Sequence, residues 1–539
     1  MNRTFKSGDS REQARLLPPR IEDYVGPDNA VRAIDSFVGA LDLVQLGFRH
    51  AKRGIGAGQP PYDPSDLLKL YLYGYINGIR SSRRLEREAG RNLELIWLLK
   101  NLEPSYRTIA NFRKENWAAL KAANRCFVLL LRELGLVGGT LVAIDGALFH
   151  GNAAKDSIFT RGKLAKQIAK LDQEIEAYRK SCDDNDATEA EQRTDGSQDA
   201  TKGGGDVGDK MKELMARRER AKADLEELES SDKGQVSTTD PDARLLSKGD
   251  QTVAGYNIQS VVDDKHKLII ESEVVNRSDA GHLHKMAKAA KELLEVDTLQ
   301  VLADTGYHSS ADLKACEDDG ITAYVPLNES NGKLEKEGRF VRKDFSYDAV
   351  TDTYRCPAGQ SLHPTKKPWE NTSGRIEFRY VGTKALCGGC PLKASCLSPK
   401  ASYRSVSRWE HEDVIDRHRE RMASEGAAGL MRRRSAIVEH PFGTLKCRAG
   451  YQHFLVRGFK KVRGEWSLMA LCYNFTRVLN ILGFDRFTTY LADKLRLAQN
   501  RYLAPLADAL RSIAPVSMRF RASILLSLAI VPFRAVPAS

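Results

Sequence analysis

The sequence predicts a mixed α/β protein in which an all-helical region precedes a mixed sheet flanked by helices. Residues 61–135 carry helical apolar spacing and no strand pattern. From 141 to 326 the order is strand, hairpin, helix, strand, helix, strand, which indicates a mixed sheet rather than a doubly wound one. With 539 residues, the chain is long enough for several domains.

Short helices are predicted in series near the N-terminus. We expect an N-terminal segment over 1–60 with a helix from Asn29 to Leu46, and then a helix beginning at Pro64, whose proline and following acid suit a first turn. Further helices are expected from Ser81 or Ser82 and after Ser105. Basic helices in series resemble a helix-turn-helix unit, so 61–135 is predicted to be a helical DNA-binding domain. An ordinary helical bundle with a basic face is the alternative.

Two aspartates are predicted at strand ends in the central region. The apolar run 141–144 ends at Asp145, and the run 299–303 ends at Asp304. A hairpin over 256–275, helices over 280–294 and 310–318, and a strand over 322–326 accompany them. The domain that contains both aspartates is expected to comprise 136–162, 250–326 and 427–485.

Two insertions and a tail complete the organisation. Residues 163–249 are predicted to form an inserted helical arm with an acidic, Gly-rich, disordered tip, because that tip can bury too little apolar surface to fold. Residues 327–426 are irregular, polar and cysteine-containing. A C-terminal helical tail is expected over 486–539.

The positive charge is concentrated near the end of the predicted core. The net charge is +12, with a pI near 9.1, which favours a polyanionic partner. Residues 430–465 hold nine Lys and Arg against two acids, Glu439 and Glu465. Glu439 is expected on a helix that breaks near Pro441-Phe442-Gly443. By itself, Glu439 either pairs with Arg434 or Lys446 on a solvated surface or holds a cation.

Asp145, Asp304 and Glu439 together suit phosphoryl-transfer chemistry. Hard divalent cations such as Mg²⁺ take oxygen ligands, and two such ions can activate an attacking oxygen and stabilise a leaving one. Singly, each acid has an ordinary alternative: a turn aspartate for Asp145, a turn cap for Asp304 and a surface helix residue for Glu439.

Three motifs around these acids are similar to those of bacterial insertion-sequence DDE transposases. They are Ala143-Ile144-Asp145-Gly146, Val301-Leu302-Ala303-Asp304-Thr305-Gly306-Tyr307, and Val438-Glu439-His440-Pro441-Phe442-Gly443-Thr444-Leu445-Lys446. The runs 454–462 and 473–475 and the N-terminal run 108–113 also resemble this family, so the likeness covers most of 60–485.

The resemblance implies an RNase H-like catalytic domain that cuts DNA at element ends and joins the free 3′-hydroxyls to a target. It implies that Asp145, Asp304 and Glu439 are the catalytic residues and hold Mg²⁺ or Mn²⁺ in a two-metal site. The DNA-binding residues are predicted to be Lys446, Arg434, Arg457, Lys460, Lys461 and Arg113. Two positions depart from the family: Met431 stands where many relatives carry Tyr, and Ser435 stands where Arg is expected, with Arg434 one residue away.

Four of the nine cysteines have metal-like spacing. Cys387 and Cys390 form a CxxC pair, with Cys356 before and Cys396 after it. Such a set suits structural Zn²⁺, while an iron–sulfur centre and unmetallated thiols remain open. Because the N-terminus has no apolar signal region and no apolar run approaches 18 residues, we expect a soluble protein with no membrane partner. The resemblance implies that it is a bacterial cytoplasmic protein, nucleoid-associated when bound to DNA.

The sequence therefore predicts a metal-dependent DNA transposase that acts on double-stranded element ends and target DNA as a homodimer or higher homo-oligomer. The alternative is a catalytically inactive, transposase-derived DNA-binding or regulatory protein. A stand-alone nuclease is a second enzyme alternative.

Overall fold

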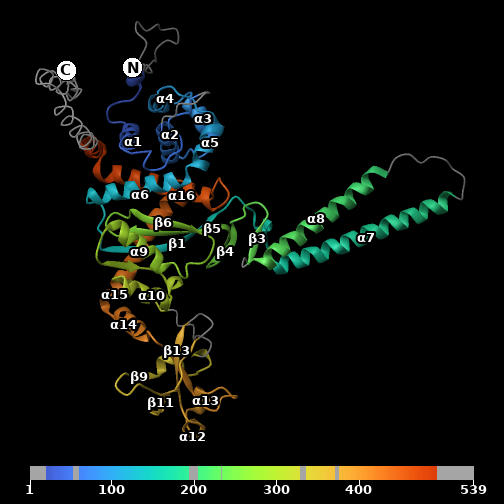
Figure 1. Ribbon diagram of the computed structural model, residues 1–539, viewed down its shortest axis with the longest axis vertical. Coiled ribbons are helices and arrows are strands. Elements are labelled where there is room, and N and C mark those ends of the chain that lie inside the picture. The colour runs from blue at the N-terminus through green and yellow to red at the C-terminus, as the bar shows by residue number, and fades with distance from the viewer. Residues whose placement is uncertain are drawn as a thin grey trace, which may run out of the picture. The chain divides into compact units, whose positions relative to one another are not determined.

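The structure is a computed structural model of the chain (Figure 1). It describes residues 20–52, 60–193, 204–231, 234–327, 335–370 and 375–494; the side chains of 185–193 and 204–208 lie outside this description. The chain divides into two compact units, one formed by 1–124 with 464–539 and the other by 125–463. The predicted C-terminal tail lies outside the described residues beyond 494.

The first unit is helical within its described residues. Its helices are α1 (Ala30–Gly39), α2 (Pro64–Ile76), α3 (Ser82–Ala89), α4 (Leu93–Leu98) and α5 (Tyr106–Glu115), with the start of α6 (Trp117–Glu133) and most of α16 (Phe459–Leu482). The Asp63 carboxylate caps α2 and the Ser105 hydroxyl caps α5, as the sequence predicted. The helix expected to reach Leu46 ends at Gly39, because the Asp42 carboxylate accepts from the amides of Val44 and Gln45 and stabilises a turn instead.

The second unit contains a six-stranded mixed sheet. Its strands are β1 (Leu141–His150), β4 (Arg244–Lys248), β5 (Gln251–Asp263), β6 (Ile269–Val275), β7 (Leu299–Leu302) and β8 (Ile321–Tyr324). The order is β4-β5-β1-β7-β8, with β6 also paired to β5. β1 runs antiparallel to β5 and parallel to β7, and β7 runs parallel to β8. The predicted mixed α/β order is confirmed.

One face of this sheet is covered by α15 (Glu425–Gly443). Leu141 and Ala143 of β1 and Leu302 of β7 form a buried cluster with Ile437 and Val438 of α15. Since alternate residues of a strand point to the same face, Asp145 points to the face that α15 covers. The helices α9 (Leu283–Leu294) and α10 (Ser310–Asp318) occupy the connections before and after β7.

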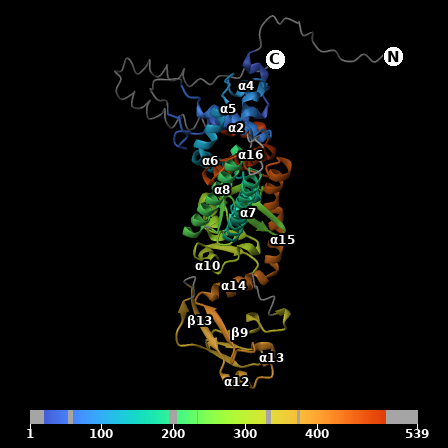
Figure 2. The same ribbon diagram turned by 90° about the vertical axis from the view of Figure 1, so that its right-hand side faces the viewer.

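The predicted insertion arm contains two long helices. α7 (Arg161–Arg193) and α8 (Gly204–Ser230) run side by side (Figures 1 and 2), and Leu164, Ala221 and Leu228 are buried between them near a two-stranded base formed by β2 (Ile158–Thr160) and β3 (Gln235–Ser237). α8 begins inside the stretch predicted to be disordered, and the rest of that stretch, 194–203, lies outside the described residues.

The region predicted to be irregular folds as a second sheet, which we call the cysteine module. It contains β9 (Ser346–Asp348), β10 (Thr353–Arg355), β11 (Ser361–Pro364), β12 (Trp369–Glu370), β13 (Ile376–Val381) and β14 (Ser405–Trp409), with α12 (Lys384–Gly388) and α13 (Lys393–Cys396) (Figures 1 and 2). The prediction was wrong because these strands are only two to six residues long, too short for an alternating pattern to stand out.

α14 (Glu412–Ala423) leads from this module into α15. α15 ends at Gly443, within the predicted break at 441–443, and passes into one π-helical turn, Thr444–Arg448. Pro441 lacks the amide that would bond to the carbonyl four residues back, but it is buried beside Phe442 and Leu445. Packing therefore holds the helix through the proline. Within the described ranges, no helix has the length and apolarity needed to cross a membrane.

Candidate active site

Asp145 lies in the middle of β1 rather than at its end. The strand continues to His150 because β5 pairs along its whole length, whereas pairing to β7 stops at Ala143. Asp145 therefore lies two residues after Ala143, the last residue of β1 that pairs with β7. Its Oδ1 accepts from the amide of Gly146 at 2.9 Å, and its side chain is 20% exposed.

Asp304 follows β7 at the same edge. Its Oδ1 accepts from the Gly306 amide at 2.9 Å and caps a 3₁₀ turn, Thr305–Tyr307. Its Oδ2 lies 3.6 Å from the Lys248 ammonium. Asp304 is thus both the turn cap and a member of a charged cluster, so the ordinary alternative accounts for only one of its two oxygens.

The charged cluster is centred on Lys248, the last residue of β4. Its Nζ lies 3.0 Å from Asp145 Oδ1, 3.1 Å from Asp279 Oδ2 and 3.6 Å from Asp304 Oδ2, and it donates to the Gly146 carbonyl at 2.7 Å. Asp145 and Asp304, far apart in the sequence, therefore meet around one cation. Sequence reasoning missed Lys248 and Asp279, since neither lies in a motif that the family resemblance picks out.

Asp279 is buried and firmly oriented. It is 8% exposed, and its Oδ1 accepts from Asn257 Nδ2 at 2.8 Å and Gln259 Nε2 at 2.7 Å. Tyr307 in turn donates its hydroxyl proton to Gln259 Oε1. A Cβ at Gly146 would meet Asp279 Oδ1 at 2.0 Å, so the glycine after Asp145 is required for this close approach.

The charge states follow from burial and from these neighbours. Burial raises the pKa of Asp145, and the charge of Lys248 opposes this rise. Burial would also raise the pKa of Asp279, but Lys248 and the two amide donors outweigh it and hold that pKa below its usual value. Burial would lower the pKa of Lys248, but Asp145 and Asp279 outweigh it and raise that pKa. The cluster is therefore a charged one, with Lys248 protonated and Asp279 ionised.

Arg434 lies beside Asp145, and Glu439 does not. Arg434 Nη1 is 4.0 Å from Asp145 Oδ1 and is a buried donor without a hydrogen-bond partner. Glu439 is exposed on α15, and among the described residues no hydrogen bond or ion pair joins it to Asp145, Asp304, Arg434 or Lys446. The structure thus brings together two of the three predicted acids.

Residues that follow Glu439 nevertheless contact β1. Residues three apart share a helix face, and Phe442, three residues after Glu439, packs on Phe149 with ring centroids 6.4 Å apart. Lys446, seven residues after Glu439, donates to the Leu148 carbonyl at 2.8 Å. Burial lowers the pKa of the Lys446 ammonium, and Lys248 adds to this effect.

Of the remaining residues predicted to contact DNA, three lie at the surface and one is buried. Arg457 and Lys460 are exposed, Lys461 is partly exposed, and Arg457 donates to Asn152 Oδ1 at 3.1 Å. Arg113 is 7% exposed, donates to the Tyr75 hydroxyl at 2.9 Å and lies 3.5 Å from the fully buried Glu465 carboxylate. Its burial contradicts the predicted DNA contact, and Arg113 is a structural residue of the first unit.

The carboxylates suit a hard cation by ligand type. No group of three or more His, Cys, Asp or Glu side chains in the described ranges is arranged to hold a metal ion as it stands. The three aspartates instead surround an ammonium, and carboxylate oxygens attract an ammonium and a divalent cation alike. The ammonium of Lys248 lies among carboxylates, and the nearby Arg434 Nη1 lacks a hydrogen-bond acceptor. This edge of the sheet can therefore bind both a cation and an anionic group.

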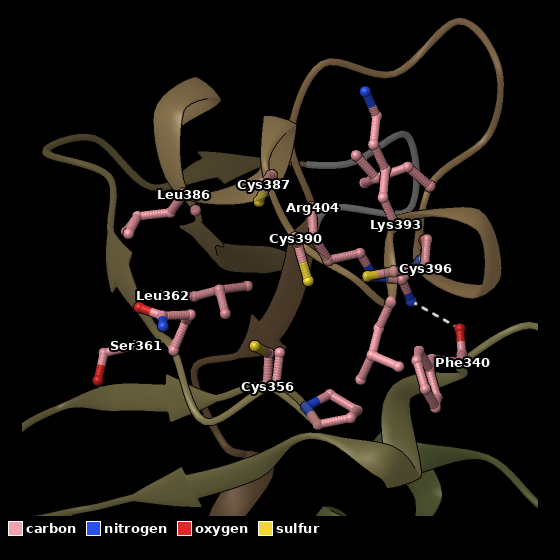
Figure 3. Close-up of a pocket in the computed structure, with 16 residues that line it drawn as sticks. Phe340, Cys356, Ser361, Leu362, Leu386, Cys387, Cys390, Lys393, Cys396 and Arg404 are labelled. Carbon is pink, nitrogen blue, oxygen red and sulfur yellow. Dashed lines mark hydrogen bonds between the residues drawn. The ribbon is translucent and has the colours of Figure 1, made fainter.

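The four predicted metal-binding cysteines lie together elsewhere, in the cysteine module. Cys356, Cys387, Cys390 and Cys396 are all free thiols and line one pocket, and Figure 3 shows their sulfur atoms around a common space. They belong to a different sheet from the aspartates.

Comparison with known families gives two transposase matches. Residues 355–479 match the family described as transposase DDE domain, and residues 19–115 match the transposase domain DUF772. Both descriptions name transposases, so these two ranges of the chain are similar to transposase domains. The DDE description confirms its resemblance to insertion-sequence DDE transposases; the matched range includes Glu439 and Lys446 but neither Asp145 nor Asp304.

Other comparisons add little. No curated protein matches the chain. Among solved structures, the cryo-EM structure of the piggyBac transposase synaptic complex with hairpin DNA covers 95% of this chain and 87% of its own, with 8% identity and a TM-score of 0.31. A likeness at this score carries no inference about the chain.

Proposed function

We propose that the chain is a DDE-type transposase that cuts DNA at the ends of an insertion sequence and transfers the 3′ ends to target DNA. The observation that carries this proposal is the convergence of Asp145, Asp279 and Asp304 on a single cation position. The two transposase matches support it. In the six-stranded sheet, β6, β5 and β1 are antiparallel neighbours, β4 also pairs antiparallel with β5, and β7 and β8 run parallel to β1; this order supports assigning an RNase H-like catalytic domain.

In this proposal Asp145 and Asp304 hold Mg²⁺ or Mn²⁺, and Glu439 supplies a third carboxylate from α15. A bound divalent metal supplies activation of the attacking oxygen and charge stabilisation of the leaving one. Asp279 keeps the cluster anionic, because Asn257 and Gln259 fix its carboxylate beside Asp145. Each Mg²⁺ usually takes one or two carboxylates and leaves positions for water and phosphate, so three acids would serve a two-metal site.

Lys248 is proposed to hold the three aspartates together before metal and DNA bind. Without a cation, three carboxylates within this distance of one another would repel strongly. The Lys248 side chain is 37% exposed, so it has solvent into which it can move. Its withdrawal would leave the oxygen ligands oriented for a divalent ion.

Basic residues around this edge are proposed to contact phosphates of double-stranded DNA. Arg434 Nη1 is a buried donor that lacks a hydrogen-bond acceptor, and a phosphate oxygen is a suitable one. Lys446, Arg457, Lys460 and Lys461 would extend these contacts to element ends and target DNA. We further propose that a homodimer or higher homo-oligomer acts on DNA in the bacterial nucleoid. Any zinc belongs to the cysteines and takes no part in this chemistry.

The test compares Asp304→Asn with Asp318→Asn. Asp318 is a matched control, since it is an exposed acid on α10 that pairs only with Lys314 among the described contacts. With Mg²⁺ and DNA bearing the element ends, Asp304→Asn should abolish cleavage and largely spare end binding, while Asp318→Asn keeps both. Full cleavage by Asp304→Asn would refute the proposed site.

A catalytically inactive DNA-binding protein is the second candidate. Glu439 is exposed, and among the described residues no hydrogen bond or ion pair joins it to Asp145 or Asp304, which favours this candidate. End binding with neither nicked nor joined DNA in Mg²⁺ or Mn²⁺ would select this candidate, and nicked but never joined products would select a nuclease.

A further inference from the structure

The cysteine module places its four cysteines at the edge of its sheet. Cys356 directly follows β10, Cys387 lies in α12, Cys390 follows that helix and Cys396 ends α13. In Figure 3 the sulfurs of these four residues face a common space. Cysteines up to 40 positions apart in the sequence (396 − 356) therefore bring their thiols together.

The backbone around these cysteines forms tight turns. Cys356 donates its amide to the Gln360 carbonyl at 2.8 Å and accepts from the Gly359 amide at 2.8 Å, and Gly359 has φ +77°, which favours glycine. Cys387 and Cys390 are separated by two glycines with open space around them. A CxxC turn of this kind presents two sulfurs on one side, as tetrahedral zinc sites use.

The guanidinium of Arg404 lies beside the four thiols. Arg404 lines the same pocket and donates to the carbonyls of Cys396 and Phe340, at 3.1 Å each. Its Nε is a buried donor with no hydrogen-bond partner. A thiolate would accept from that donor and balance the guanidinium charge, whereas a neutral thiol is a weak acceptor.

The module has little apolar material with which to hold itself together. Its core has five buried side chains, and two of the cysteines pack against it with three partly buried aromatic residues. The buried residues are Phe345, Tyr354, Leu362, Tyr380 and Val406, and those packed against them are Cys356, Cys396, Phe340, Tyr347 and Phe378. None of the described cysteines forms a disulfide. Small domains with a core of this size usually need a covalent or metal crosslink.

We propose that Cys356, Cys387, Cys390 and Cys396 bind one structural Zn²⁺ as four thiolates. On binding, four S–H bonds break, four Zn–S bonds form and four protons leave to solvent, with no change in oxidation state. In the structure, no group of three or more His, Cys, Asp or Glu side chains in the described ranges is arranged to hold a metal ion. The four sulfur atoms must therefore move closer together when zinc binds, because zinc–sulfur bonds are about 2.3 Å long. The site is independent of the aspartate cluster and of the proposed transposase function.

The first test uses the wild-type full-length protein, purified without chelator. Elemental analysis should find one zinc per chain, and exchange with Co²⁺ should give the visible d–d absorption of a tetrahedral tetrathiolate. Adding zinc to the metal-free chain should protect four thiols from a thiol reagent. A chain that takes up no zinc and leaves every thiol reactive, or one that carries an iron–sulfur chromophore, would overturn the proposal.

Variants locate the ion. Cys390→Ser should lower zinc content about tenfold or more, while Cys447→Ser, which removes an exposed thiol outside the module, should leave it unchanged. Arg404→Leu should weaken zinc binding by about 10–100-fold, as the loss of a supporting group does. Equal zinc in Cys390→Ser and Cys447→Ser would place the metal elsewhere and refute the assignment. None of these measurements depends on cleavage of DNA.

Discussion

Replacing Lys248 by Met tests the cation position at the centre of the aspartate cluster. The change keeps an unbranched side chain, one heavy atom shorter, and removes the charge 3.0, 3.1 and 3.6 Å from three carboxylates. Breaking a buried ion pair costs about 3–5 kcal/mol. Because Lys248 is 37% exposed, solvent screens part of this loss, and we expect about 1–3 kcal/mol of destabilisation in EDTA.

Mg²⁺ should reverse that loss. If the Lys248 ammonium occupies the position where a divalent ion binds, Mg²⁺ must displace it in the wild type but not in Lys248→Met. Mg²⁺ should therefore stabilise the variant more than the wild type. A difference of 1.4 kcal/mol in this stabilisation corresponds to about a tenfold gain in Mg²⁺ affinity. Urea unfolding with and without Mg²⁺ measures both effects.

The matched control is Lys288→Met, which removes an ammonium 3.0 Å from one partly exposed carboxylate, that of Asp319. Because solvent screens this pair, the change should alter stability far less than Lys248→Met and leave the response to Mg²⁺ as in the wild type. If Lys248→Met were as stable as the wild type in EDTA, or gained no more from Mg²⁺, the cation-position reasoning would be refuted.

Three further outcomes follow from the same contacts. Gly146→Ala should destabilise by about 1–3 kcal/mol and impair cleavage because its Cβ would meet Asp279 Oδ1 at 2.0 Å, whereas Gly162→Ala, with open space around it, should do neither. Glu465→Ala should lose about 3–5 kcal/mol in urea unfolding by leaving the buried guanidinium of Arg113 uncompensated. Since the pKa of Asp279 is held below its usual 3.8, its stabilising contribution is complete above that pH and is lost as pH falls through the lowered pKa; Asp279→Asn should therefore flatten the acid limb of the stability profile.

The central region was predictable from sequence because its pattern is strong and local. The strand over 299–303, the hairpin and the helix from Ser310 to Asp318 follow from apolar runs bounded by turn residues, and the structure confirms each of them. Asp145 was placed at a strand end because Gly146 reads as a terminator. In the structure β5 pairs along the full length of β1 and overrides that local signal.

The cluster around Asp145 was only half predictable. Asp279 and Lys248 come from a loop and from the end of an edge strand, and no spacing rule links them to Asp145. Only the tertiary fold, through Asn257 and Gln259 of β5, brings Asp279 to the cluster. At Pro441, packing outweighs a local rule. Proline disfavours a helix interior, yet α15 stays helical through Pro441, where Phe442 and Leu445 are buried after it.

The most direct test of the catalytic account is a strand-transfer assay with the wild-type chain and three variants, Asp145→Asn, Asp304→Asn and Glu439→Gln. Purified protein is incubated with labelled DNA carrying the inverted ends that flank its reading frame, a target plasmid, and Mg²⁺ or EDTA, and end binding is measured in parallel. We predict joined products only for the wild type with Mg²⁺, and end binding for all four proteins. Joined products from Glu439→Gln, or from the wild type in EDTA, would contradict the proposed carboxylate–metal site.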